Sequence, residues 1–205
     1  MGNFRHVIFY ALFFSMIFFF MCTPSIALTL SQKGEIVLLA GHINNGDDVE
    51  FKDFINSPAN AQIKIIQLQS GGGNINAAKL IARLIRDKKL TTLVNAKTDN
   101  CASACTLLFS AGIKRHYVNA QDIEDGLYGL KQNTNGLGYH QGSNRNSNEL
   151  GHYSENATKS MIAAFNEMGT HKGKDLMAFA STLWLYRISS HTALKFGIAT
   201  SLSMP

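Results

Sequence analysis

Residues 100–109 read NCASACTLLF, and this stretch decides how the rest of the chain is interpreted. Ser103 stands between two alanines and two cysteines, just before an apolar run, which is typical of a tight turn that opens a buried helix. At such a position the serine Oγ lies beside free backbone N–H groups and the positive end of the helix dipole. Both favour a nearby anion, as a serine nucleophile requires. The same pattern also fits a serine that only caps a helix.

Short apolar runs alternate with helix patterns on both sides of this stretch. Strands are expected at residues 35–41, 63–68, 90–95 and 113–118. Helices are expected at residues 47–56, at 75–89 and directly after Ser103. The helix at 75–89 carries one apolar stripe, with its basic side chains off that stripe. Strand and helix in alternation predict an α/β fold with parallel strands and crossover helices.

The alternation fails between residues 119 and 148, which are rich in Gly, Asn and Gln. Within this segment only residues 137–141 are expected to end a strand. Helices resume at about 154–168 and 174–183, and Ser189 is placed to cap a last helix that Gly197 ends. A short final strand is expected at residues 198–202.

The N-terminus predicts export. Arg5 and His6 precede a predominantly apolar run over residues 7–21, and the small residues of Ser25-Ile26-Ala27 fit a signal-peptidase site. We expect residues 1–27 to be a signal peptide and residues 28–205 to form one domain with a sizeable core. The alternative is an uncleaved anchor, which would be the chain's only membrane contact.

Charge and cysteine content exclude several classes of function. The formal net charge of +5 comes from scattered Lys and Arg without interleaved aromatics, which disfavours nucleic-acid binding. Cys101 and Cys105 can form a disulfide in an oxidising compartment if the turn between them is tight, and are otherwise two buried thiols. With no His at ligand spacing they make no zinc site, so no metal is expected.

Three features suggest acyl-transfer chemistry. Gly71-Gly72-Gly73 follows a strand and opens a helix, where backbone N–H groups can bind an anion, although no Gly-Lys-Ser/Thr follows as in a P-loop. Ser103 with the N–H of Ala104 is the second feature. The third is His140, whose imidazole can take the Ser103 proton and return it to a leaving group.

The order of these motifs resembles the Clp (caseinolytic) protease proteolytic subunit, and more closely its exported bacterial relatives in the Clp/crotonase superfamily. The resemblance spans about residues 34–200. It rests on four motifs, each similar to one of the family's: the glycine loop, the small-residue serine turn, the aromatic-His-Gln element and the closing helix. In this chain they are Gln69-Ser70-Gly71-Gly72-Gly73, Cys101-Ala102-Ser103-Ala104-Cys105, Tyr139-His140-Gln141 and Thr192–Ile198.

The resemblance implies a single-domain, Clp/crotonase-like spiral of parallel β-strands with crossover helices. It implies a serine peptidase that needs no cofactor, with Ser103 as nucleophile, His140 as general base, and Gly73 and Ala104 as oxyanion-hole donors. The substrate would be a peptide or an unfolded protein, in the periplasm or outside the cell. Relatives form rings or trimers, so a homo-oligomer fits as well.

The chain departs from the family at the third catalytic group. The family has an acid shortly before the closing helix, whereas residues 183–188 read LWLYRI. Asp175 is the nearest upstream acid, and the acids at residues 122–125 are a further source. Three interpretations stay open: a Ser–His dyad, a triad with an acid from elsewhere, and an inactive binding module. Four other histidines compete as the base: His152 is the strongest candidate, and the others are His116, His171 and His191.

Overall fold

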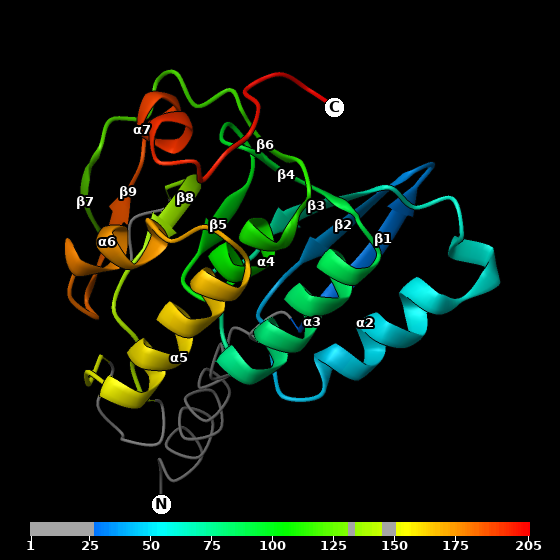
Figure 1. Ribbon diagram of the computed structural model, residues 1–205, viewed down its shortest axis with the longest axis horizontal. Helices are drawn as coiled ribbons and strands as arrows, with labels where there is room; N and C mark the ends of the chain where they lie inside the picture. The colour runs from blue at the N-terminus through cyan, green and yellow to red at the C-terminus, as the bar shows by residue number, and fades with distance from the viewer. Residues whose placement is uncertain (1–26, 131–133, 145–150) are drawn as a thin grey trace, which may run out of the picture.

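The computed structural model describes residues 27–130, 134–144 and 151–205, and their strands form two sheets (Figure 1). The first sheet has the order β1-β2-β3-β4-β6. Strand β1 is antiparallel to β2, and the other pairs are parallel. Its strands are β1 (Thr29–Lys33), β2 (Ile36–Ala40), β3 (Ile65–Gln69), β4 (Thr91–Asn95) and β6 (Arg115–Val118).

The second sheet is smaller and has the order β5-β8-β9-β7. Strand β5 is parallel to β8, whereas β9 is antiparallel to both of its neighbours. Its strands are β5 (Asn100–Ala102), β8 (Gly136–Tyr139), β9 (Trp184–Arg187) and β7 (Gly126–Gly129). The two sheets meet through a parallel bridge between Ser70, which follows β3, and Cys101 in β5.

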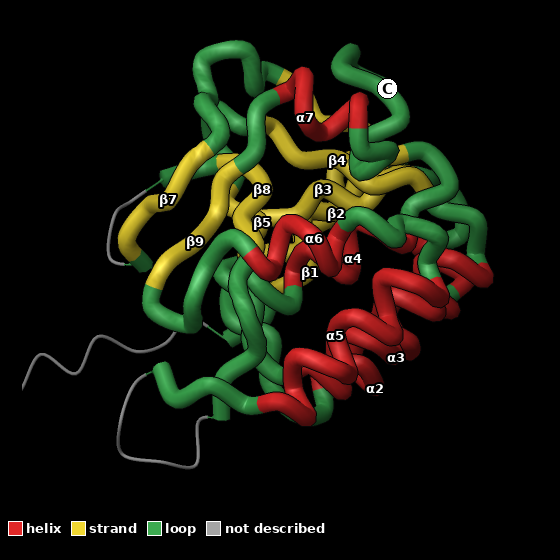
Figure 2. The backbone as a smooth tube through the Cα atoms, turned by 60° about the vertical axis from the view of Figure 1, so that its left-hand side comes forward, coloured by secondary structure: helices red, strands yellow, loops and turns green. Residues whose placement is uncertain are grey.

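The helices cover the sheets. They are α2 (Asp47–Asn56), α3 (Ile75–Asp87), α4 (Cys105–Ala111), α5 (Glu155–Glu167), α6 (Gly173–Ala178) and α7 (Ser190–Lys195), with a short 3-10 turn η1 (Pro58–Asn60). Figure 2 shows α2, α3 and α5 side by side along one side of the molecule. Helix α3 buries the apolar stripe that its sequence predicts, and all residues of α4 are buried.

The architecture confirms the expected α/β single domain with parallel strands and crossover helices. The strands and helices predicted up to residue 118 are present, with ends that differ by at most two residues. The helix expected at 174–183 is shorter and ends at Ala178, because the chain then enters β9. The final strand expected at 198–202 is wrong, since only one bridge joins Ser201 to His116.

Strands β1, β5, β7 and β9 were not expected from the sequence. Each is short, and β9 depends on pairing with β8 and β7, which come from the segment in which the sequence pattern fails. Local patterns do not encode such distant pairings. The predicted signal peptide falls almost wholly on residues 1–26, which lie outside the described residues. None of the helices in the described ranges is long and apolar enough to cross a membrane.

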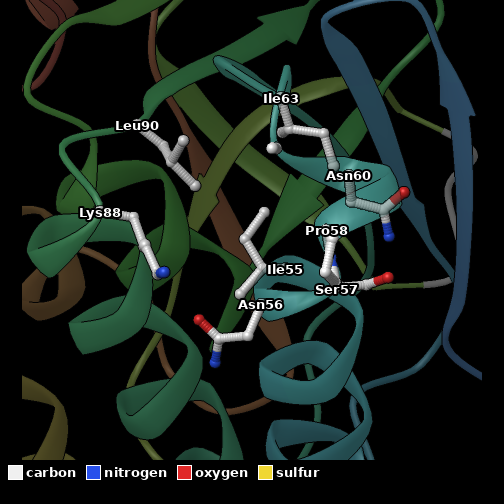
Figure 3. Close-up of a pocket in the computed structure, with 9 residues that line it drawn as sticks. Ile55, Asn56, Ser57, Pro58, Asn60, Ile63, Lys88 and Leu90 are labelled. Carbon is white, nitrogen blue, oxygen red and sulfur yellow. The ribbon is translucent and has the colours of Figure 1, made fainter.

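A hollow of about 300 Å³ lies at the amino ends of β3 and β4 (Figure 3). Ile55, Ile63 and Leu90 form its apolar part, and the Lys88 side chain lies at its rim. The chemistry-bearing motifs follow the carboxyl ends of β3, β5 and β8 instead. This hollow is therefore not part of the candidate active site.

Candidate active site

Two short parallel strands place Ser103 and His140 at the same edge of the second sheet. Strand β5 pairs with β8 in the register Asn100↔Gly136 to Ala102↔Gly138. Ser103 directly follows β5, and its N–H donates to the carbonyl oxygen of Gly138 at 2.9 Å. His140 directly follows β8. In this register Ser103 is level with Tyr139, so Ser103 and His140 follow the carboxyl ends of two neighbouring parallel strands, offset by one residue.

The Ser103 turn is conformationally unusual. Ser103 has φ of 55°, in the left-handed region that costs a residue with a side chain about 1–2 kcal/mol. It is partly exposed, whereas its neighbours Ala102 and Ala104 are buried. Ala104 occupies the N-cap position of α4, and no side chain caps that helix. Helix capping therefore does not explain Ser103, and this turn presents its side chain at the surface.

Covalent and hydrogen-bonded contacts hold this turn in place. Cys101 and Cys105 are joined by a disulfide, with their Cα atoms 5.3 Å apart, which confirms the expected bond. The carbonyl of Ser103 accepts from the N–H of Thr106 at 2.9 Å and from its Oγ1 at 2.6 Å. Because both sulfurs are in the disulfide, neither cysteine is a free nucleophile in this state.

The glycine loop packs directly on the serine. A Cβ at Gly72 would lie 2.7 Å from the Cβ of Ser103 and 2.8 Å from the nitrogen of Ala104. Gly72 also has φ of 94°, which favours glycine. Only a residue without a side chain allows this approach, so the loop after β3 lies against the turn after β5.

Hydrogen bonds fix the orientation of the Gly72–Gly73 and Ser103–Ala104 peptide units. In each unit the carbonyl oxygen accepts a hydrogen bond, and the N–H points in the opposite direction. The carbonyl of Gly72 accepts from the N–H of Ile43 at 3.0 Å, so the Gly73 N–H in the same trans peptide points away from Ile43. The carbonyl of Ser103 points into α4 toward Thr106, so the Ala104 N–H points back out of the helix N-terminus. These are the two predicted oxyanion-hole donors, and their assignment to that role stays a prediction.

His140 is buried, with 8% of its surface exposed. Its Nδ1 has no hydrogen-bond partner among the residues that the structure describes. Burial lowers the pKa of His140, and the main chain of Gln141 offsets part of this shift. The imidazole is therefore neutral at pH 7, which is the form that a general base requires.

The structure does not bring the predicted third group to His140. Asp175 lies in α6, where its carboxylate accepts from Lys172 Nζ at 2.9 Å, and this hydrogen bond lowers the pKa of Asp175. Asp125 accepts from the main-chain N–H of Ser189 at 2.6 Å and from the Thr192 hydroxyl, so it holds the start of α7.

The residue level with His140 on the neighbouring strand is apolar. Continuing the β8–β9 register from Gly138↔Arg187 and Tyr139↔Tyr186 places Leu185 opposite His140. Because paired residues of antiparallel strands point to the same face, Leu185 and His140 share one face. Leu185 is 5% exposed. Extended by this one pair, the register therefore puts an uncharged side chain level with His140.

The competing histidines differ from His140 in their surroundings. His116 Nδ1 is 2.6 Å from the Ser203 carbonyl oxygen at the C-terminal segment, and His171 Nδ1 is 3.1 Å from Asn166 Oδ1. His152 and His191 are exposed. The described residues contain no group of three or more His, Cys, Asp or Glu that could hold a metal ion.

One neighbour of the site was missed by sequence reasoning. His42 follows β2, and its Cε1 lies 2.8 Å from where a Cβ of Gly73 would stand. The loop holding it runs beside the glycine loop through the Ile43–Gly73 bridge. Its position after a predicted strand was a usable signal, because carboxyl ends of parallel strands share one edge.

Comparison with known proteins supports the fold. No family model and no curated protein matches the chain. Among solved structures, it is similar to the 1510-N membrane-bound stomatin-specific protease in a mutant form, with a TM-score of 0.54 and 15% identity over 84% of this chain and 81% of that one.

Two further solved structures are similar. The ClpP protease catalytic domain from Plasmodium falciparum has a TM-score of 0.51 and 12% identity, over 83% of this chain and 86% of that one. A mutant of ClpP1 from Listeria monocytogenes has a TM-score of 0.51 and 19% identity, over 83% of this chain and 92% of that one. The chain thus has a fold similar to that of the Clp proteases.

Proposed function

We propose that this chain is a serine peptidase in which Ser103 attacks the scissile carbonyl and forms an acyl-enzyme. The observation that carries the proposal is the β5–β8 pairing, because Ser103 and His140 directly follow these two neighbouring strands at their carboxyl ends. The glycine loop packed on Ser103 supports the same assignment. The strained, partly exposed Ser103 turn supports it further, because strain of this kind clusters at functional sites.

The proposed reaction divides the work among four groups. His140 takes the proton of Ser103 Oγ as the oxygen bonds to the carbonyl carbon, then gives it to the leaving amine as the C–N bond breaks. Water then attacks the ester, again with His140 as base, and releases the acid product and free Ser103. The N–H groups of Gly73 and Ala104 stabilise the tetrahedral oxyanion, each contributing about 10²–10³ in rate. No cofactor takes part.

Peptides are the proposed substrate class. The similar solved structures are described as proteases, including one specific for stomatin. We further propose that the mature chain, residues 28–205, acts in the periplasm or outside the cell on short or unfolded peptides. The apolar N-terminus and the Cys101–Cys105 disulfide support this location. Assembly as a homo-oligomer is part of the same proposal.

Fluorophosphonate labelling tests the proposal. The wild type and Ser103→Ala, His140→Ala and Ser110→Ala variants are compared after their folding is checked by circular dichroism. Ser110 is the matched control, because it lies in the same stretch but is fully buried. We expect the wild type and Ser110→Ala to be labelled and to cleave fluorescent casein, and the other two variants to lose both. Equal labelling of Ser103→Ala, or none in a folded wild type, would overturn the assignment.

A non-catalytic peptide-binding module is the second candidate. The observation favouring it is that His140 Nδ1 meets no carboxylate within the described ranges. A triad with its acid replaced can lose about 10⁴ in kcat. A folded wild type that binds unfolded casein, without labelling or cleavage, would support this candidate instead.

A further inference from the structure

Arg187 carries a buried guanidinium in an unusual environment. It lies in β9 with 1% of its surface exposed. Nη1 donates to the Gly136 carbonyl at 2.6 Å, and Nη2 donates to Asn100 Oδ1 at 2.8 Å and to the Thr134 carbonyl at 2.7 Å. Nε donates to Thr134 Oγ1 at 3.2 Å. None of these partners is a carboxylate, and burial lowers the pKa of Arg187 to about 10.

Burying the Arg187 guanidinium without a carboxylate partner costs free energy. Removing a cation from water costs several kcal/mol, and hydrogen bonds to neutral oxygens return only part of that. Gly138 shows how closely the side chain packs, because a Cβ there would lie 2.8 Å from Arg187 Nη1. An apolar residue would fill this space at a lower cost in desolvation free energy. The guanidinium with its fork of N–H donors (Nε, Nη1 and Nη2) therefore needs an explanation.

The fork contacts both residues of the first pair between β5 and β8. Asn100 and Gly136 are partners in that register, and the guanidinium bonds to each of them. Ser103 follows the same strand three residues after Asn100, and His140 lies four residues after Gly136. One side chain thus ties together the starts of the two strands that end at the candidate site.

The ladder that sets this register is short. The ladder between β5 and β8 has three pairs, and two of the four residues of β8 are glycine. Short, glycine-rich strands are prone to slip, and a slip by one residue moves a strand by about 3.3 Å. A shift of that size would separate Ser103 from His140, because proton transfer requires hydrogen-bond reach.

We propose that Arg187 is a positioning residue for the hydrolase site: its fork of hydrogen bonds to Asn100 and Gly136 fixes the register of β5 on β8 and so holds Ser103 beside His140. This inference rests on the proposed function. It assigns Arg187 no contact with substrate. It also accounts for a glycine at position 138, where the guanidinium occupies the space of a side chain.

The test compares Arg187→Met and Arg187→Lys with Arg115→Met in fluorophosphonate labelling and in hydrolysis of a small p-nitrophenyl ester. Arg115 is the matched control, since it is a partly buried arginine that also bonds to main-chain carbonyls, those of Gly112, Gly197 and Ile198, none of which belongs to the candidate site. We expect both Arg187 variants to lose about 10²-fold in labelling rate, as for a misplacement of about 1 Å. We expect kcat to fall with KM little changed. Arg115→Met should lose thermal stability and keep its labelling rate.

Asn100→Ala provides a milder variant if the Arg187 variants fail to fold. It removes one acceptor of the fork and is expected to lose about tenfold in labelling. Combined with Arg187→Lys it should add little, because both changes break the same contact. A wild type that labels, beside folded Arg187 or Asn100 variants that label equally well, would overturn the inference. A wild type that does not label would instead overturn the proposed function.

Discussion

Replacing Gly72 by alanine tests how tightly the glycine loop fixes the nucleophile. The new Cβ would lie 2.7 Å from both the Ser103 Cβ and the Ala102 carbonyl oxygen, whereas ordinary contact begins at 3.4 Å. Ser103 must then move by about 0.7 Å, or the loop must move away from it by the same amount. Either movement separates the glycine-loop N–H groups from the serine.

The expected loss has two parts. The positive φ of Gly72 costs alanine about 1 kcal/mol, and the overpacking costs about 1–3 kcal/mol. Together they lower the free energy of unfolding by about 2–4 kcal/mol, which is roughly 4–16 °C in Tm for a domain of this size. The displacement of Ser103 should lower the labelling rate by about 10²-fold, as expected for misplaced reacting groups.

Two other glycines separate these effects. Gly34 also has a positive φ, but nothing lies within 4 Å of its would-be Cβ, so Gly34→Ala should lose stability and keep its labelling rate. A Cβ at Gly71 meets only Asn100 Nδ2 at 3.8 Å, so Gly71→Ala should change little. Folding is followed by near-ultraviolet circular dichroism and labelling by gel fluorescence. A folded Gly72→Ala that labels at the wild-type rate would refute the reasoning.

Three further predictions follow from the same geometry. Leu185→Asp places a carboxylate level with His140 and should be labelled at least tenfold faster than Leu185→Asn, which has the same shape without the charge. Equal labelling rates would show that the register does not bring residue 185 and His140 together. Reducing the Cys101–Cys105 disulfide should cost about 2 kcal/mol by loop entropy and lower Tm by roughly 4–8 °C, with no such response in a variant in which both cysteines are alanine. Because burial lowers the pKa of His140, the labelling rate should be half-maximal below pH 6.5. Thermal stability should be constant above about pH 6.5 and should fall as the pH is lowered further. The reason is that His140 of the unfolded chain then binds a proton, whereas His140 of the folded chain stays neutral. His140→Gln should remove that part of the slope, and a slope unchanged in His140→Gln would contradict the assignment.

Local patterns identified the parts of the fold that are defined by neighbours in sequence. Helix α3 was predictable because its apolar residues recur with helical spacing. Strands β3 and β4 were predictable from β-branched runs between turn signals. The alternation of strand and helix patterns was enough to expect an α/β fold, and the glycine loop and His140 were expected at strand ends.

The second sheet could not be predicted in this way. Strand β7 is four residues long with glycine at both ends, and β9 follows a helix that was expected to continue. Both form by pairing with residues far away in sequence, so their stability does not lie in local propensity. The buried Arg187 was invisible for the same reason, because its partners come from β5, β8 and the residues before β8. The missing carboxylate at residues 183–188 was visible in sequence, but that Leu185 stands level with His140 required the register.

The most direct test of the central claim is to locate the phosphonate adduct by mass spectrometry. Intact mass gives the number of adducts, and tandem spectra of the tryptic peptide 98–114 distinguish Ser103 from Ser110, the other serine in it. We predict one adduct per chain, on Ser103. An adduct on another residue of a folded protein, or an unchanged mass after prolonged labelling, would contradict the assignment of Ser103 as the nucleophile.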